Sequence, residues 1–399
     1  MWAEQERQTI SHLHSNSRPL GSFQGGASMR ELAELRRLDP DATKFSLDQL
    51  WSVLEHQAEV DPRYKVTFST IHARGDCADL FSRPESEEFR VVREQHDGFS
   101  LYDLTRVISR SDIEGGSRTV SGTFGLYKDE AEDIWTAFTS EGPDFLKSGL
   151  IRFVESFRPA VASIHLTSGQ LRHLFEHLED ATGCRILVTK AVLYSHREEG
   201  AIDFKERSYQ ELFNFAESED DYVDKIEYEL KKDGETVFHA FTSRDGISYY
   251  YGGQIRYLRD TFLPALAAAT SRNSELFEHR ERDLAKDLLK PLDIVYDRDV
   301  FTSAEDNLRL IRALANVDRS GLAVLHKNPY LHVSFLDFYD GATFDIFATG
   351  SNRISIIPGY RSSVHALSRI TEQIFKDFQE GSIEEESQPE YSLTDFLSQ

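Results

Sequence analysis

The sequence predicts an α+β protein made of three tandem units, and three observations support this prediction. The run Ala-Phe-Thr-Ser at 137–140 returns at 240–243 and, in the looser form Phe-Ala-Thr-Gly, at 347–350. Each copy is followed by a turn, a short β-prone run and a segment with apolar residues at helical spacing. With 399 residues, the chain is also long enough for several hydrophobic cores. Self-similarity of this kind is typical of repeated structural units.

We expect each unit to follow the order strand, helix, antiparallel strands, helix, with the helices packed on one sheet face. A polar, flexible lead at 1–42, with a short helix at 28–38, precedes the first unit at 43–160. In this unit, Ser46 is a typical N-cap for a helix over 47–60 that has one apolar face. Its other predicted elements are strands at 64–71, 90–92 and 119–127, a hairpin strand at 134–140 and a helix at 150–162.

The second unit, 161–290, repeats this order around a charged excursion at 195–221 and ends in a connecting helix. Its predicted strands are 161–166, 185–194, 222–230, 236–242 and 247–251, and its predicted helices are 170–181, 254–268 and 274–289. The closing helices of the first two units should bury an apolar face against their own sheets, and Pro159 and Pro264 should lie near the helix ends. The residues expected in those faces are Ile151, Phe153, Phe157, Ile255, Leu258 and Phe262.

The third unit, 291–380, shows the clearest pattern. Its predicted strands are 292–296, 321–325, 331–339, 343–349 and 354–357, and its predicted helices are 303–317 and 362–378. The first helix begins with a capping pattern from Ser303 to Asp306. An acidic tail follows at 381–399, in which Tyr391 and Phe396 are spaced apolar residues. We expect the tail either to dock on a partner or to lie over the protein's own surface.

Composition limits the classes of function. The net charge is -23, and every unit is acidic, which disfavours a large phosphate-binding face. The two cysteines, Cys77 and Cys184, form no Cys-x-x-Cys pair, so neither a disulfide scaffold nor a zinc knuckle is expected. No apolar run approaches the roughly 20 residues that span a bilayer, and the first residues lack a secretion signal. We therefore expect a cytoplasmic protein with no membrane partner.

The third unit resembles one half of the TATA-box-binding protein fold. The resemblance rests on the order of its elements and on the runs Ile346-Phe347-Ala348-Thr349-Gly350 and Ile354-Ser355-Ile356-Ile357-Pro358-Gly359. It implies a curved sheet whose hairpin Phe wedges between DNA bases, which nominates Phe347, Phe241 and Phe138. Arg244 and Arg353, in the adjoining turns, would then touch phosphates. The alternative is that each Phe is buried under its helix.

The run His173-Leu174-Phe175-Glu176-His177 matches the H-x-x-E-H zinc pattern and resembles the pitrilysin and insulinase peptidases. In those enzymes both His residues bind zinc and the Glu acts as the general base. The position of their third ligand falls near Asp287 and Leu288 here, not on a Glu. The alternative is a solvated face, because Leu171, Leu174, Phe175 and Leu178 form the apolar stripe of the same helix.

We therefore predict a non-catalytic recognition or adaptor protein that binds a protein partner or assembly through sheet faces and hairpin tips, without a cofactor or metal. One alternative is a zinc-dependent peptidase-like hydrolase at His173, Glu176 and His177. Another is a DNA-binding saddle that uses Phe241 and Phe347. The predicted partner-binding residues are Phe138, Phe241, Arg244, Phe347, Arg353, Tyr391 and Phe396.

Overall fold

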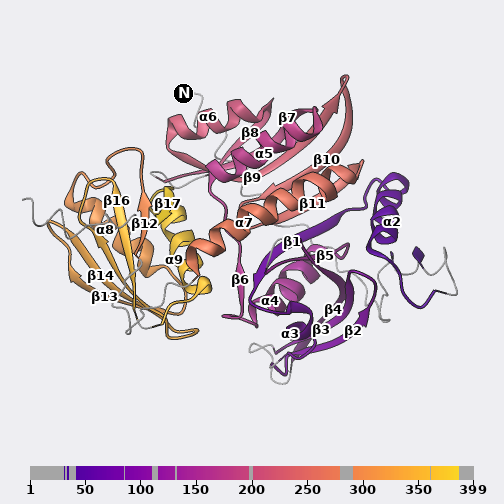
Figure 1. Ribbon diagram of the computed structural model, residues 1–399, viewed down its shortest axis with the longest axis horizontal. Coiled ribbons are helices and arrows are strands. Elements are labelled where there is room, and N and C mark those ends of the chain that lie inside the picture. Colours follow the sequence, from indigo (N-terminus) through magenta and orange to yellow (C-terminus); the bar gives the residue numbers. More distant parts are fainter. Residues whose placement is uncertain are drawn as a thin grey trace, which may run out of the picture.

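The computed structural model describes residues 31, 34–35, 42–84, 86–109, 116–130, 133–196, 201–278, 291–359 and 361–385. It confirms the α+β class, because helices pack on two antiparallel sheets (Figure 1). None of the helices in the described part of the chain is both long enough and apolar enough to cross a bilayer.

The larger sheet joins the segments predicted as the first and second units. Its eleven strands include ten in the order β2-β3-β4-β5-β1-β11-β10-β9-β7-β8, and the eleventh, β6, pairs with β1. The strands are β1 (Val66–Ala73), β2 (Phe89–Gln95), β3 (Ser100–Ser109), β4 (Ser117–Lys128), β5 (Ile134–Thr139), β6 (Val161–Ser163), β7 (Arg185–Ser195), β8 (Ala201–Ser208), β9 (Asp221–Lys232), β10 (Glu235–Ser243) and β11 (Ile247–Gly253). Strand β1 is the junction, since it pairs with β5 on one side and with β11 and β6 on the other.

The smaller sheet has six strands in the order β13-β14-β15-β16-β12-β17. They are β12 (Leu292–Val295), β13 (Ser320–His326), β14 (Leu331–Asp337), β15 (Thr343–Ala348), β16 (Arg353–Pro358) and β17 (Ser382–Glu385). The segment expected to be an acidic tail therefore begins with a strand, β17, which pairs with β12. The order β13-β14-β15-β16-β12 has the same connectivity as β2-β3-β4-β5-β1 in the larger sheet.

Eight α-helices and two π-helices of the described chain have defined bounds. They are α2 (Leu47–Val60), α3 (Cys77–Phe81), η2 (Phe145–Leu150), α4 (Ile151–Glu155), α5 (Ser168–Thr182), α6 (Tyr209–Glu219), η3 (Leu258–Phe262), α7 (Leu263–Phe277), α8 (Ala304–Ala315) and α9 (Val364–Asp377). Helix α2 has the predicted bounds, and the Ser46 side chain caps it by accepting from the Gln49 amide. At α8, the Ser303 amide donates to Asp306 Oδ2 at 2.9 Å, as the capping pattern predicts.

Several local predictions need correction. The helix expected at 150–162 begins earlier, as η2, and α4 ends before Pro159. The helix expected at 254–268 and the start of the connecting helix form one continuous run, η3 and α7. Pro264 therefore lies inside this run, where η3 passes into α7, and the expectation that it lies near a helix end is wrong. The change from π- to α-helical hydrogen bonding at this junction accommodates the missing backbone N–H. The charged excursion contains β8 and α6, and residues 279–290 lie outside the described part.

Helices cover both faces of the larger sheet, so the expectation of one covered face is wrong for it. Phe68 and Ile71 are three residues apart on β1 and therefore point to opposite faces. Phe68 lies in the core with α2, α5 and α7, whereas Ile71 lies in the core with α3, η2 and α4. The reason lies in how the two units join at β1. Strands β5 and β11 both run antiparallel to β1, one on each side of it, so the second unit is rotated by half a turn about the strand direction and its helices lie on the opposite face. The six-stranded sheet follows the prediction, since α8 and α9 share one core with a single face of it.

The apolar faces expected for the closing helices are buried. Phe153 and Leu258 are fully buried, as is Phe262, and Phe157 lies at the edge of its core. Ile151 is only half-buried. In the first unit, Phe153 of α4 packs on Phe124 of β4. In the second, Phe262 of η3 packs on Tyr228 of β9, whereas α7 continues across β1 and β5 of the first unit.

Candidate protein-docking surface

Among the described residues, no helix packs on the face of the six-stranded sheet opposite α8 and α9, and we call this face open. On β14, Leu331, Val333 and Phe335 are buried toward the helices, while the alternate residues His332 and Leu336 point the other way. On β15, Phe347 also points to this open face, and its ring stacks on that of His332 with centroids 4.1 Å apart. The open face therefore presents a half-buried aromatic pair, and Asp345 Oδ1 lies 3.3 Å from His332 Nε2 on the same face.

Exposed apolar side chains concentrate on the β13–β14 hairpin at one edge of this sheet. Of the seven large hydrophobic residues with high exposure in the described part of the chain, five lie between 324 and 338, on β13, on β14 and in the flanking turns. The five are Val324, Leu325, Tyr330, Leu336 and Phe338. Leu325 and Phe338 are both 59% exposed, far more than a residue that belongs to the core. Leu325 and Tyr330 lie at the turn of the β13–β14 hairpin, and Leu336 and Phe338 lie at its other end. Exposed apolar side chains gathered on one element are typical of interaction sites.

Strand β13 lies at the edge of the sheet. Among the described residues it pairs only with β14, so one side of its backbone has no strand neighbour. Natural edge strands usually carry charges or proline that prevent further strand pairing. The residues of β13, Ser320 to His326, include no Lys, Arg, Asp, Glu or Pro. A bulge distorts only its last residues, after Val324, which leaves an apolar edge available to another strand.

Sequence reasoning missed this edge because it followed the repeated phrase instead of the strand order. The absence of charge from Ser320 to His326 was the available signal, although it gains meaning only once β13 is known to be at the sheet edge. Of the predicted partner-binding residues, Phe347 lies on the open face of this sheet. Arg353 lies on the neighbouring strand β16 and forms an ion pair with the buried carboxylate of Asp293 at 3.1 Å.

Phe241 lies on the larger sheet and is half-buried. Its ring stacks on Tyr249 with centroids 4.9 Å apart, and the Lys65 ammonium lies over the same Tyr249 ring. Phe241 points away from its own helices, because its neighbour Ala240 is buried in the core with α5 and α7. It therefore faces a surface formed by β1, β11, β10 and β9, separate from the six-stranded sheet.

Two predicted contact residues are buried, and their expected roles need correction. Phe138 is 1% exposed, because α2 and the rest of its core cover the face to which it points. Arg244 is 4% exposed, and its Nη2 lies 2.6 Å from Glu380 Oε1 and 2.6 Å from His165 Nε2. The Arg244 guanidinium also lies over the Tyr222 ring. Neither residue reaches a partner in this conformation, and Tyr391 and Phe396 lie outside the described residues.

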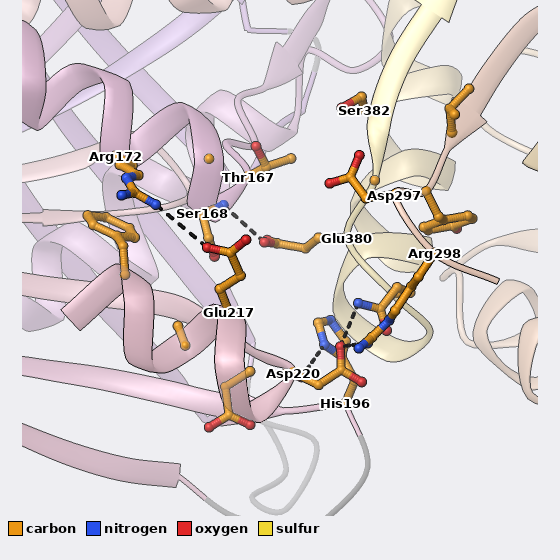
Figure 2. A pocket seen from close by; sticks show the side chains of 18 of the residues that line it. Thr167, Ser168, Arg172, His196, Glu217, Asp220, Asp297, Arg298, Glu380 and Ser382 are labelled. Carbon is orange, nitrogen blue, oxygen red and sulfur yellow. Dashed lines mark hydrogen bonds and ion pairs between the residues drawn. The ribbon is translucent and has the colours of Figure 1, made fainter. Parts of the chain in front are cut away.

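A polar cleft of about 660 Å³ separates α5 and α6 from the segments that follow β12 and α9 (Figure 2). Its lining contains six carboxylates and two arginines, which disfavours an anionic ligand. The carboxylates are Glu176, Glu217, Asp220, Asp221, Asp297 and Glu380, and the arginines are Arg172 and Arg298. Arg298 is paired with Asp220, and Glu380 accepts from the Ser168 amide at the start of α5.

The H-x-x-E-H segment lies on the outer face of α5, beside this cleft. His173 and His177 are exposed, as the amphipathic pattern predicted, and His173 Nδ1 lies 2.9 Å from Glu176 Oε2. Within the described chain, no third acidic or histidine side chain joins the two histidines in a metal-sized group. The geometry of a peptidase zinc site is therefore incomplete in this part of the molecule.

No protein-family description matches this sequence, and neither does any curated protein.

Proposed function

We propose that this protein is a non-catalytic recognition protein that binds an extended segment of a protein partner. The segment adds to the free edge of β13 and lies beside the open face of the six-stranded sheet. The observation that carries this proposal is an uncharged edge strand flanked by exposed Leu325, Leu336 and Phe338. In such strand addition, main-chain hydrogen bonds supply affinity, and alternate side chains supply specificity.

Another edge strand, β2, differs from β13 in its charged residues. Strand β2 ends the larger sheet and also exposes an apolar residue, Val92, at 68%. It carries Arg90, Arg93 and Glu94, which discourage pairing with another strand. Strand β13 has no such protection, so we infer that its edge is kept apolar for a partner.

Two alternative functions receive less support. A DNA-binding saddle needs accessible aromatic wedges and cations, but Phe138 and Arg244 are buried, and the chain is acidic throughout. A zinc peptidase needs a third ligand at His173 and His177, and the described residues supply none.

We further propose that the three units share one plan similar to a half of the TATA-box-binding protein fold. The shared connectivity of β2-β3-β4-β5-β1 and β13-β14-β15-β16-β12 supports this. The repeated phrase supports it for the second and third units only, because Phe241 lies on β10 beside β11 and Phe347 lies on β15 beside β16. In the first unit the phrase lies on β5, which matches β16 in the strand order and is followed by η2 without the expected further strand. In the second unit, β1 occupies the place beside β11 that β12 occupies beside β16. Superposition of the three units in an experimental structure tests this proposal.

Selection from a random peptide display library tests the recognition function. The full chain serves as bait, peptides that also bind an unrelated protein are removed, and the affinity of the others is measured for the original chain and for a Leu325→Lys variant. We expect the remaining peptides to be apolar and extended, and to bind Leu325→Lys at least about tenfold more weakly, because a charge at the edge opposes strand addition. Hydrogen exchange should show new protection of β13 amides when the peptide binds.

Val92→Lys is the matched control, since Val92 is an equally exposed apolar residue on the other unpaired edge. It should leave peptide affinity unchanged. Peptides that protect only amides outside β13 and β14, or that bind both variants as well as the original chain, would refute the proposed docking edge. Concentration-dependent dimerisation lost in Leu325→Lys would show instead that the edge joins two copies of the chain.

A further inference from the structure

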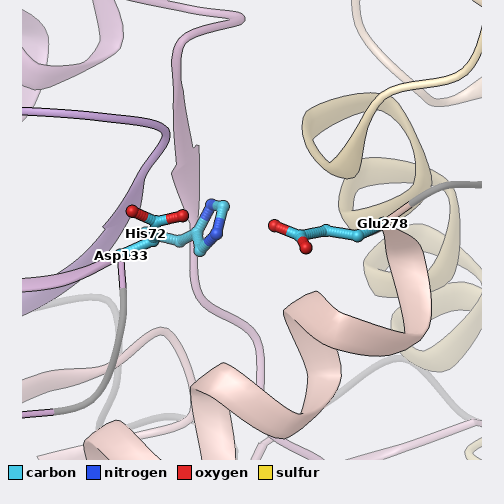
Figure 3. Close-up of side chains that lie close together, drawn as sticks. All are labelled: His72, Asp133 and Glu278. Carbon is cyan, nitrogen blue, oxygen red and sulfur yellow. The ribbon is translucent and has the colours of Figure 1, made fainter.

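Three side chains with metal-binding atoms converge where α7 ends beside the larger sheet (Figure 3). His72 lies on β1, Asp133 lies just before β5, and Glu278 is the C-cap residue of α7. One ligand atom from each residue lies within 4.8 Å of the other two. Because the residues come from three distant parts of the chain, their convergence depends on the folded structure.

The backbone holds each of these residues in place. His72 is paired on both sides, opposite Ile134 of β5 and Ala162 of β6. Asp133 has a left-handed backbone with φ of 59°, and its carbonyl accepts from the Ala73 amide at 2.9 Å. The Glu278 amide donates to the Ser274 carbonyl at 2.9 Å. Fixed backbones of this kind favour a preorganised ligand set.

The His72 imidazole is in a state that suits coordination. The residue is 5% exposed, and its ring forms no hydrogen bond or ion pair with another described residue. Its ring nitrogens are therefore not engaged by another described side chain, and one of them lies within 4.8 Å of a carboxylate oxygen of Asp133 and of Glu278.

We propose that His72, Asp133 and Glu278 bind one divalent transition-metal ion of the zinc class. An imidazole nitrogen favours zinc and its neighbours over magnesium and calcium, and two carboxylates supply the charge that offsets the ion. Zinc–ligand bonds of about 2.1 Å place ligand atoms at most about 4.2 Å apart, so the two carboxylates move slightly inward on binding. Water completes the coordination.

The site would act as a clamp between two parts of the molecule. His72 and Asp133 belong to the segment predicted as the first unit, and Glu278 ends the closing helix of the second. A bound ion would join the end of α7 to β1 and to the start of β5. Metal binding should then raise the stability of the full chain, because a ligand that binds only the folded state shifts the folding equilibrium.

Zinc titration of the metal-free full chain tests this proposal. Calorimetry should show one zinc per chain with micromolar or tighter affinity, and zinc at about 100 times the dissociation constant should raise the melting temperature by about 3 °C or more. Glu278→Gln keeps the side-chain shape and should weaken binding at least about tenfold. His72→Ala should abolish it. X-ray absorption should show one nitrogen and two carboxylate ligands.

His177→Ala is the matched control, because it removes an exposed histidine from the H-x-x-E-H segment. Zinc affinity should stay within about twofold of the original value. Circular dichroism shows whether each variant is folded, and Glu278→Gln carries the test if His72→Ala is not. The proposal is overturned if the original chain binds no zinc at millimolar concentration, if Glu278→Gln binds as tightly as the original chain, or if His177→Ala loses the binding.

Discussion

Phe138 and Phe347 lie in two copies of the repeated phrase, on strands β5 and β15, which hold different places in the strand order of their sheets. One of them is buried and the other is half-exposed. Each points away from the helices of its own unit, because the adjacent Ala137 and Ala348 are buried against those helices. Phe138 is 1% exposed, packed with Phe68 beneath α2, whereas Phe347 is half-buried and stacks on His332. The phrase thus sets the direction of the Phe side chain, and distant elements decide whether anything covers it.

The helices that cover Phe138 come from both the first and the second unit. Trp51 of α2 stacks on Phe68 and meets the edge of Tyr127, both neighbours of Phe138. Helices α5 and α7, from the second unit, complete the same core. In the described part of the six-stranded sheet, nothing equivalent lies over Phe347. The two Phe side chains therefore meet different surroundings, a closed core in the larger sheet and a half-exposed face in the six-stranded sheet.

The two sheets should differ most in how much the free energy of unfolding falls when Phe138 or Phe347 is replaced with Ala. Phe138→Ala should lower the free energy of unfolding by about 3 to 5 kcal/mol, because it leaves a cavity in a closed core. Phe347→Ala removes a stacked pair at a half-open site and should cost about 1 kcal/mol. Urea denaturation of both variants measures the difference. Equal losses would mean that Phe347 is also covered, and that the open face is not a docking surface.

The sequence predicted the helices with strong local signals and missed what depends on strand order. Helix α2 was predicted within its bounds because Ser46 caps an amphipathic run. Helix α6 was missed inside the charged excursion, although Tyr209, Leu212, Phe213 and Ala216 are buried at helical spacing and gave a usable signal. Strand β3 and the short α3 were also missed.

The sites were harder to predict than the elements. The phrase located Phe347 on the open face, but nothing local distinguishes it from Phe138, because the cover depends on how α2 and α7 pack. The group of His72, Asp133 and Glu278 spans more than two hundred positions of sequence, so no local spacing could indicate it. The edge position of β13 likewise follows only from the strand order.

The helix-covered side of the six-stranded sheet should exclude water. The pH dependence of stability that arises from His365 of α9 provides a test. His365 is 1% exposed, and burial, followed by the nearby Arg158 and Arg369, lowers its pKa to about 4. The unfolded chain binds a proton near the ordinary pKa of 6.5, whereas the folded chain does so only near 4. Stability from this group is therefore present above pH 6.5 and is lost as the pH falls toward 4.

Replacing His365 with Leu should remove about 3 kcal/mol of this acid-dependent loss between pH 6.5 and 4. Buried His72 and His165 also have lowered pKa values, so some acid sensitivity should remain in the variant. Urea denaturation of both proteins at pH 7, 5.5 and 4.5 measures the change in slope. An unchanged slope would show that the His365 ring is hydrated in the folded state, and that even the helix side of this sheet is not closed.

The smallest expected effect concerns the residue opposite each Phe on the neighbouring strand. Gly125 lies opposite Phe138, and a Cβ at Gly125 would meet the Phe138 ring at 2.0 Å, so the ring lies directly on the glycine backbone. His332 lies opposite Phe347 and stacks on it instead.

Gly125→Ala should lower the free energy of unfolding by about 1 to 3 kcal/mol, because the Phe138 ring has no room to move aside in a closed core. His332→Ala should lower it by less than about 1 kcal/mol. In a Phe138→Leu background the Gly125→Ala cost should fall, because the two residues are coupled only through the ring. If Gly125→Ala is as costly in that background as in the original chain, the glycine is required by the backbone and not by Phe138, and the contrast between the covered and the open Phe would rest on burial alone.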